Sequence, residues 1–537
     1  MTGTYVVNDI SMPIDASFEE AFSVARKRLK SLSVSLTDAK FSVYRKSVDA
    51  RNRENIKFVY SISVSGDFGN VDNDRLLRNK ISKIDLETPE FHIGHEALNS
   101  NIVVVGAGPA GLFAALVLAE QGYRPIIIER GGSVSERTSA IEKFKKTRVL
   151  DVNSNIQFGA GGAGTFSDGK LITRVNDPYS AFVLKKFVEF GAPSEIIYEA
   201  RPHIGTDYLS LVVENMIQRI IELGGRIMYH TEFLDFEFIA DRIASVKTNK
   251  GLIDASAVVL AIGHSARDTY TTLLDRDIDI VAKSFSVGMR IEHLTRDIDN
   301  ALYGAFAGHP KLGHAEYNLS YDTKNRGVYT FCMCPGGVVV PAASEVGGVV
   351  VNGMSEHGRD GRNSNSAVCC SIFTEDFGNT PFGAINFQRE IERGAFGSAG
   401  GDYSAPITTF GDFLLDKYIT EPTRVIPTYA DTMSVSVRSP YSYLPAFVCD
   451  KLKNGILSFD RKIPGFASKD AVLTGAETRT SAPVRILRNP ETRQSLKFNN
   501  LYPTGEGAGY AGGITSAAID GIRTAISIIS RYKPLYG

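Results

Sequence analysis

The sequence predicts an α/β protein that combines a parallel sheet and a β-meander with a β-rich region and a small α+β module. Three observations predict this arrangement. After residue 100, continuous apolar runs alternate with helical patterns, as is typical of buried parallel strands and their crossover helices. Short strand patterns separated by tight turns follow at 226–248, and 283–480 is β-rich and irregular. The 537 residues suit two or three domains of about 150 residues each.

The first 97 residues predict the small α+β module. An extended run at 5–10 precedes Ser17 and Glu20, which have the spacing of a capping box, and apolar residues then recur at helical spacing. Two β-rich runs follow at 39–48 and 56–64. This βαββ order predicts half of a ferredoxin-like fold.

A glycine fingerprint follows the first buried strand, at 102–105. Gly106 permits the tight turn, Gly108 lets the backbone approach a pyrophosphate, and Gly111 allows close packing of helix on strand. The next strand, 125–128, ends at Glu129, where a carboxylate can accept hydrogen bonds from an adenosine ribose. Strand, fingerprint, helix, strand and acid together predict a Rossmann-like dinucleotide-binding fold. The expected contacts are Gly106, Gly108, Pro109, Ala110, Gly111 and Glu129.

Two further segments resemble flavoproteins of the glutathione-reductase type, which have two dinucleotide-binding folds. The segment 129–137, ERGGSVSER, resembles their ERG…R segment, and 502–514 is similar to their C-terminal flavin motif. The resemblance implies bound FAD, with Arg130 and Arg137 near it and Glu506 on the ribityl chain. The amides of Gly512, Gly513 and Ile514 would face the flavin pyrimidine edge. Position 506 is Glu where Asp is common in that motif.

A third glycine loop lies at 155–171. Its 164–170 stretch has Walker A spacing but ends in Leu171, which lacks the hydroxyl that binds Mg²⁺, so we reject an NTPase. The loop resembles a family of bacterial FAD-dependent dehydrogenases of largely unknown substrate, with Ala160 where those proteins have Glu. Segments 46–51, 201–207, 263–270, 287–293, 329–337 and 477–485 fit the same family. The cofactor contacts that this resemblance implies are Gly161, Gly162, Thr165, Ser167, Gly263 and Gly505.

These motifs divide the chain into three expected domains. The N-terminal α+β module takes 1–97. An FAD-binding domain, interrupted in sequence, takes 98–282 and 481–537. The β-rich stretch 283–480 is expected to cover the flavin as a substrate domain.

The catalytic residues are less clearly signalled than the cofactor contacts. Most of the polar candidates lie in segments where we expect a strand to meet a loop, and each alone is more often a satisfied structural residue. Arg479 precedes the flavin motif and could anchor an anion, and Lys170 lies on the glycine loop. The candidates are His203, Arg290, His293, Arg479 and Lys170.

The cysteines favour packing over redox chemistry. Cys332 and Cys334 are two residues apart, so on a strand they would face the same side, and a disulfide between them would be strained. Structural burial is the preferred interpretation, with a redox role left open. No zinc-binding spacing occurs among the five Cys and nine His, so we expect no metal.

Composition excludes several classes of protein. Lys and Arg total 59 against 60 Asp and Glu, for a net charge of −1, so a globally basic nucleic-acid binder is excluded. There is no apolar run long enough for a membrane span and no secretory leader pattern. An odd number of cysteines without framework spacing favours a reducing compartment, and we expect a cytoplasmic protein.

The function predicted is an FAD-dependent oxidoreductase acting on a small organic molecule. Because the chain has no second dinucleotide fingerprint, NAD(P)H is expected only as a transient reductant. The alternatives are a flavin-dependent monooxygenase, or a flavin-binding scaffold whose mildly basic N-terminal module binds RNA or a protein partner. The sequence identifies neither the substrate nor the oligomeric state.

Overall fold

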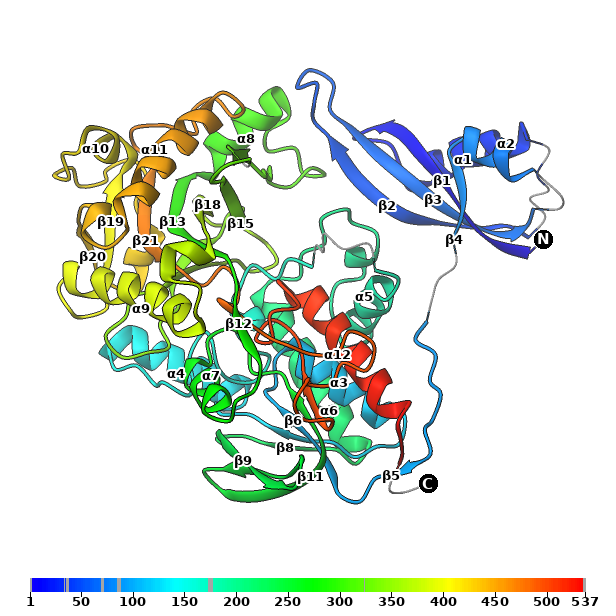
Figure 1. Ribbon diagram of the computed structural model, residues 1–537. Coiled ribbons are helices and arrows are strands. Elements are labelled where there is room, and N and C mark those ends of the chain that lie inside the picture. Colours follow the sequence, from blue (N-terminus) through cyan, green and yellow to red (C-terminus); the bar gives the residue numbers. More distant parts are fainter. Residues whose placement is uncertain are drawn as a thin grey trace.

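A computed structural model describes residues 2–32, 34, 38–68, 72–84, 88–171, 177–322 and 324–534 of the chain. The small module lies to one side of a larger body, in which the last helix is central (Figure 1). Within the described ranges, no helix is both long and apolar enough to cross a membrane.

The N-terminal module has the complete ferredoxin-like topology. Its sheet has the order β2-β3-β1-β4 with antiparallel neighbours, and the capping box predicted at Ser17 and Glu20 is present. The sequence pattern indicated only the first half, because the second helix and the last strand have six and four residues. The elements are β1 (Thr2–Pro13), α1 (Phe18–Lys30), β2 (Lys40–Asp49), β3 (Lys57–Asp67), α2 (Asn73–Arg78) and β4 (Ile81–Ile84).

The predicted parallel sheet and β-meander are both confirmed. Strands β8-β7-β6-β11 are parallel neighbours, and β23 extends this sheet beside β11. The first residues of β11 instead pair antiparallel with β10, which pairs with β9. The strands are β6 (Asn101–Val105), β7 (Ile126–Ile128), β8 (Arg226–Met228), β9 (Phe233–Ile239), β10 (Arg242–Thr248), β11 (Gly251–Leu260) and β23 (Leu501–Pro503). The helices of this unit are α3 (Pro109–Glu120), α4 (Val134–Thr147), α5 (Ser180–Glu189), α6 (Thr206–Glu222), α7 (Arg267–Asp275) and α12 (Ile514–Ile529).

Helices α3 and α12 pack closely against each other although they are about 400 residues apart in sequence (Figure 1). Small residues make this approach feasible. A Cβ on Gly521 of α12 would lie 2.1 Å from the Ala110 carbonyl oxygen of α3. The close crossing places the N-termini of both helices at one end of the parallel sheet.

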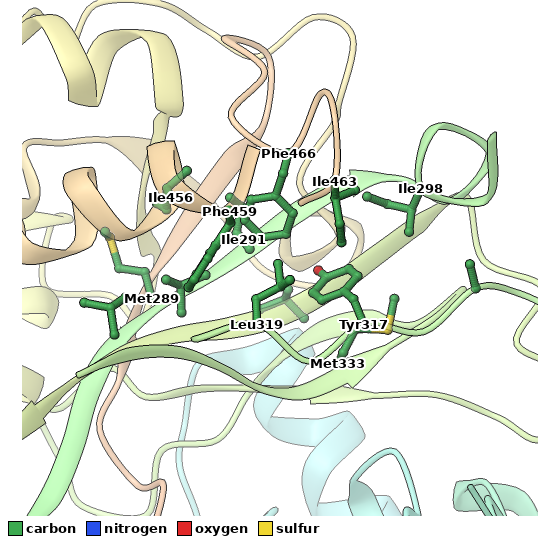
Figure 2. Packing of buried hydrophobic residues seen from close by; sticks show 14 of the residues in the cluster. Met289, Ile291, Ile298, Tyr317, Leu319, Met333, Ile456, Phe459, Ile463 and Phe466 are labelled. Carbon is green, nitrogen blue, oxygen red and sulfur yellow. The ribbon is translucent and has the colours of Figure 1, made fainter. Parts of the chain in front are cut away.

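A second large sheet forms the β-rich unit, with the order β14-β15-β18-β13-β21-β19-β20. Figure 2 shows Met289 and Ile291 of β13 packed against Ile456 and Phe459 of helix α11. The strands are β13 (Phe285–Leu294), β14 (Ser320–Tyr321), β15 (Val328–Cys334), β18 (Asn363–Ile372), β19 (Ala405–Thr409), β20 (Val435–Val437) and β21 (Val472–Glu477), and the helices are α8 (Thr295–Tyr303), α9 (Pro381–Ser398), α10 (Phe410–Leu415) and α11 (Ala446–Asp460).

Three two-stranded pairs complete the structure. The pairs are β5 (Glu96–Ala97) with β24 (Tyr532–Lys533), β12 (Ile280–Ala282) with β22 (Val484–Ile486), and β16 (Val338–Pro341) with β17 (Val351–Met354).

Strand β2 of the N-terminal module adds to a short stretch of the larger body. The Lys46 amide donates to the Tyr198 carbonyl at 2.7 Å, and the Ala200 amide donates to the Lys46 carbonyl at 2.8 Å. The Lys46 ammonium also pairs with Glu199 at 2.9 Å. A few residues further on, the Leu171 amide donates to the Pro202 carbonyl at 3.0 Å. The module is therefore joined by backbone hydrogen bonds to the stretch that borders the third glycine loop.

The crossing of α3 and α12 predicts the effect of Gly521→Ala. The new methyl group would clash with backbone, so we expect the free energy of unfolding to fall by about 1–3 kcal/mol, measured by urea denaturation. Gly397→Ala is the matched control, because this helical glycine has open space around it and alanine should raise stability by up to about 1 kcal/mol. Equal effects of the two substitutions would contradict the packing argument.

Candidate functional site

One cavity lies where the carboxyl ends of β6, β7 and β11 meet the β-rich unit, and its volume is about 230 Å³. This edge is where ligands bind in open α/β sheets. All three glycine loops contribute to its lining, and the β-rich unit supplies the opposite wall through Phe331, Cys332, Asn352, Gly353 and Glu477.

The three fingerprint glycines have different steric roles. Gly106 has φ +101°, and a Cβ there would lie 2.4 Å from the Ala261 carbonyl oxygen, while Gly111 is equally confined behind the loop. A Cβ on Gly108 would have no neighbour closer than 3.8 Å, and this glycine lines the cavity together with Pro109 and Ala110. Gly106 therefore serves the tight turn and Gly111 the packing of the helix. Gly108 leaves open space beside the cavity.

The Glu129 carboxylate connects three backbone segments at the cavity. One oxygen accepts from the Ala107 amide at 2.9 Å. The other accepts from the amides of Gly131 at 2.9 Å and Gly159 at 3.0 Å. Glu129 and Arg130 both line the cavity, and contact of the carboxylate with a ribose stays a prediction.

Arg137 is fully buried behind the cavity and does not line it. Its guanidinium donates to the carbonyl oxygens of Asn155 and Ile156, each at 2.8 Å. It also donates to those of Ala160 at 2.8 Å and Gly162 at 2.9 Å. Arg137 therefore holds the shape of the third glycine loop, and any effect on a cofactor would act through that loop.

The third glycine loop is pressed against the fingerprint. The Gly161 amide donates to the Ala107 carbonyl at 2.8 Å, and a Cβ on Gly162 would lie 2.9 Å from the Gly108 Cα. Gly162 and Ser167 line the cavity, whereas Gly161 and Thr165 line a small apolar space behind it. Two of the four predicted contacts in this loop thus face the cavity.

The C-terminal glycine loop closes the other side. Gly512, Gly513 and Ile514 line the cavity, as do Gly263 and Glu506. Gly505 lies behind them, where its amide donates to Asp520 at 2.7 Å. Among the described residues no side chain caps the N-terminus of α3 or of α12. Both helix N-termini therefore present uncapped backbone amides at one cavity.

Glu506 is a carboxyl group without a hydrogen-bond partner among the described residues, and it faces the cavity. Burial raises its pKa to about 7, although the Lys283 ammonium acts in the opposite direction. A carboxyl group that titrates near neutrality can either donate to or accept from a hydroxyl group.

Two of the five catalytic candidates line the cavity. Lys170 donates to the Met333 carbonyl and lies 3.6 Å from the Asp168 carboxylate. Arg479 makes two 3.0 Å hydrogen bonds to Glu392. Burial alone would raise the pKa of Glu392, but its guanidinium neighbours lower it well below its usual range. Arg479 is thus largely occupied by an internal ion pair.

The other candidates do not line the cavity. Arg290 and His293 lie within β13, so the expectation that they lie where a strand meets a loop is wrong. This strand is buried along nearly its whole length, and its charged side chains are buried with it. Arg290 donates to Glu477 at 2.9 Å and to the Asn352 side chain at 2.9 Å. It therefore fixes two residues of the cavity wall from behind. His203 lies behind Lys170, paired with it as a β-bridge.

The paired cysteines are not equivalent. A β-bulge follows Phe331, so Cys332 lines the cavity whereas Cys334 is fully buried. Both thiols are free. Burial raises the pKa of Cys332 to about 11 and holds the pKa of Cys334 well above its usual range, which favours the thiol over the reactive thiolate.

Sequence reasoning missed two polar residues of the cavity wall, Asn352 and Glu477. Glu477 ends the apolar strand β21, so the rule that singled out Glu129 at the end of β7 could have found it. Asn352 carries no such signal, because β17 is short and its flanks are irregular. Among the described residues, no group of three His, Cys, Asp or Glu side chains is arranged to hold a metal ion.

Three family models match the chain. One described as an FAD binding domain matches residues 99–143, and one described as an FAD-dependent protein, C-terminal domain-like, matches 284–480. A domain of unknown function (DUF8436) matches 5–65. An uncharacterized protein of Clostridium beijerinckii is 44% identical over 530 residues, which cover 97% of this chain and 98% of that protein. The chain belongs to this family of FAD-dependent proteins.

The resemblance to FAD-dependent proteins found in the sequence is thereby confirmed. Solved structures similar to this FAD-dependent protein include L-amino acid deaminase from Proteus vulgaris, at 13% identity, 84% and 94% coverage of the two chains and a TM-score of 0.36. Glycine oxidase from Bacillus cereus is 11% identical, with 81% of this chain and 99% of that chain covered and a TM-score of 0.35. Likenesses at these scores do not bear on the reaction.

Arg137→Met is expected to unfold the third glycine loop. The substitution leaves the buried carbonyl groups of Asn155, Ile156 and Ala160 without a donor, so we expect a loss of about 3 kcal/mol or more in the free energy of unfolding, with FAD binding lost as well. Arg137→Lys should not restore either property, because an ammonium cannot reach all four acceptors. The control is Arg276→Met, which breaks a partly exposed pair with Asp235 and should cost at most about 1 kcal/mol. Full rescue by lysine would contradict this role.

Glu506 predicts a pH-dependent stability of the FAD-free protein. Its pKa is about 7 in the folded chain and about 4.3 when unfolded, so ionisation disfavours the folded state as pH rises between these values. Relative to wild type, the free energy of unfolding of Glu506→Gln should therefore rise by up to about 3 kcal/mol as the pH increases from 4.5 to 7. Above pH 7 the difference should stay constant.

The measurement is thermal unfolding at pH 5 and pH 8. Glu54→Gln, at an exposed position, is the control. A gain from Glu506→Gln that is the same at both pH values would contradict the buried carboxyl argument.

Proposed function

We propose that this protein is an oxidoreductase that transfers a hydride equivalent or electrons between bound FAD and a small organic substrate. The observation that carries the proposal is that two uncapped helix N-termini and the unpartnered Glu506 carboxyl group face one cavity. FAD, when bound, supplies the two-electron chemistry.

The residues present fit this cofactor. Gly108 and Gly512 leave open space where a side chain would fill the cavity, and the N-terminus of α3 suits a pyrophosphate. The N-terminus of α12 carries a partial positive charge that stabilises a nearby anion. Glu506 can hydrogen-bond a ribityl hydroxyl, and Glu129 retains acceptor capacity for a ribose.

The wall formed by the β-rich unit would contact the substrate. It offers a hydrogen-bonding amide at Asn352 and a carboxyl group at Glu477, and the Lys170 ammonium of the third glycine loop lines the same cavity. Arg290 fixes the first two from behind. Burial raises the pKa of Glu477, and the neighbouring Arg290 opposes that change. A polar, hydrogen-bonding organic molecule suits this wall better than a purely apolar one.

NAD(P)H would act only as a transient reductant. The glycines at 394 and 397, which lie in a glycine-rich stretch, are part of helix α9 and form no loop. That stretch therefore supports no second dinucleotide fold, and electrons could equally come from the substrate or another protein.

The purified protein should contain FAD at about one per chain, detected by its visible absorbance and by release on denaturation. Gly108→Val should lower FAD affinity on the order of 100-fold, because the side chain enters the cavity without backbone strain. Gly397→Ala should bind FAD as wild type does. Anaerobic bleaching of the flavin by an organic donor would favour a dehydrogenase, and oxygen uptake coupled to NAD(P)H would favour a monooxygenase. Absence of FAD would refute the proposal.

A further inference from the structure

A buried polar cluster borders the cavity beside Lys170. Asp168 and Lys170 line the cavity, and His203 and Arg359 lie behind them. The side chains of Asp168 and His203 are 4% and 7% exposed, and that of Arg359 is 14% exposed. None of the cofactor contacts described above uses this cluster.

Three atoms of the cluster face one another without hydrogen-bond partners among the described residues. They are Asp168 Oδ2, His203 Nδ1 and Arg359 Nη2. Oδ2 lies 3.8 Å from His203 Nδ1 and 3.6 Å from Arg359 Nη2, beyond direct hydrogen-bond distance. Each buried polar atom left unpaired costs about 1–3 kcal/mol, so the three atoms need a common partner.

The surrounding groups are already engaged with other atoms of the cluster. The Ser355 hydroxyl donates to Asp168 Oδ1 at 2.5 Å. Arg359 Nη1 donates to Glu316 at 2.7 Å, and Arg201 lies 3.4 Å from Glu316 on the outer side. The His357 ring stacks on the His203 ring, with centroids 5.9 Å apart. None of these neighbours forms a hydrogen bond with Asp168 Oδ2, His203 Nδ1 or Arg359 Nη2.

The hydrogen-bond pattern fixes the tautomer of His203. Nε2 lies 3.1 Å from the Glu356 carbonyl oxygen, and because a carbonyl only accepts, Nε2 carries the hydrogen. Neutral His203 then presents an acceptor at Nδ1, opposite a carboxylate oxygen that also only accepts. Burial and the charge of Arg359 lower the pKa of His203 to about 4, which agrees with a neutral ring at pH 7.

A water molecule satisfies all three atoms at once. It can donate one hydrogen to Asp168 Oδ2 and the other to His203 Nδ1, and it can accept from Arg359 Nη2. The protein atoms are 3.6–3.8 Å apart, a separation at which a bridging water has to be considered, and buried waters commonly make about three hydrogen bonds.

We propose that a buried water molecule joins Asp168, His203 and Arg359, and that this assembly positions the Lys170 ammonium as a proton donor to the substrate. The second part rests on the proposed oxidoreductase function. Asp168 Oδ2 lies 3.6 Å from Lys170 Nζ, where a carboxylate favours the ammonium form. The Met333 carbonyl holds the same ammonium from the cavity wall.

The proton donated by Lys170 balances the reaction in the reducing direction. The substrate gains a hydride equivalent from reduced FAD, the N–H bond of Lys170 breaks, and an O–H or N–H bond forms on the substrate. The substrate thus gains two electrons and two hydrogens. Solvent water returns the proton to Lys170, and an external two-electron donor, dithionite in the assay below, reduces FAD again.

The first experiment tests the water and the tautomer. A crystal structure of the whole FAD-loaded chain should show a water within about 3.2 Å of all three atoms. Nitrogen-15 NMR should show neutral His203 with hydrogen on Nε2 at pH 7, and Asp168→Asn should shift its Nδ1 signal. His293, a buried histidine whose Nε2 also faces a carbonyl, is the internal control and should not shift. Direct contact of Asp168 with a charged His203 would overturn the water assignment.

The second experiment tests Lys170 and Asp168 separately from FAD binding. Menadione reduction by the dithionite-reduced, FAD-loaded protein should slow on the order of 100-fold in Lys170→Arg, which keeps the charge but does not release a proton. Asp168→Asn should slow it about tenfold and change its pH profile. Lys185→Arg, the same change at an exposed position, should keep the wild-type rate. Unchanged FAD content with a wild-type rate in Lys170→Arg would overturn the donor role, whereas loss of FAD from the wild-type protein would refute the oxidoreductase function instead.

Discussion

The cavity depends on one carboxylate. Glu129, at the end of a buried strand, accepts amide hydrogens from the fingerprint loop, from its own turn and from the third glycine loop. These segments are rich in glycine, so a large part of what can be anchored in them is backbone. A buried carboxylate with three amide donors is a strong, directional anchor, and it lies at the edge of the sheet where open α/β folds bind their ligands.

The opposite wall depends on charge that is enclosed within the β-rich unit. Arg290 lies in a strand whose other residues are nearly all buried, and it reaches through to Glu477, Asn352 and the Cys332 carbonyl. Such buried charges are costly unless every hydrogen is used, and here they fix residues that line the cavity. The two sides of the cavity are thus built differently. The glycine loops present backbone amides, whereas the β-rich unit presents side chains that Arg290 holds in place.

The features that could be predicted from the sequence are those that depend on residues close together in the chain. The turn at Gly106 and the close packing at Gly111 follow from a strand that turns into a helix, and the structure reproduces both. Approach of a pyrophosphate to Gly108 stays a prediction. Contacts between distant segments carry no such local pattern. Arg290 looks like a surface residue at a strand end until the seven-stranded sheet encloses it, and Asn352 has no neighbouring motif at all. The second half of the ferredoxin-like module was missed because its helix and strand are too short to show a period.

The backbone pairing between β2 and 198–200 makes the N-terminal module part of the mechanics of the site. The paired stretch continues into Pro202 and His203, which border Leu171 and Lys170. The chain therefore connects the module's edge to the cavity wall through one short hydrogen-bonded stretch. Linkage is reciprocal: if displacing the module changes the affinity of the cavity for its contents, then filling the cavity changes the free energy of module docking by the same amount.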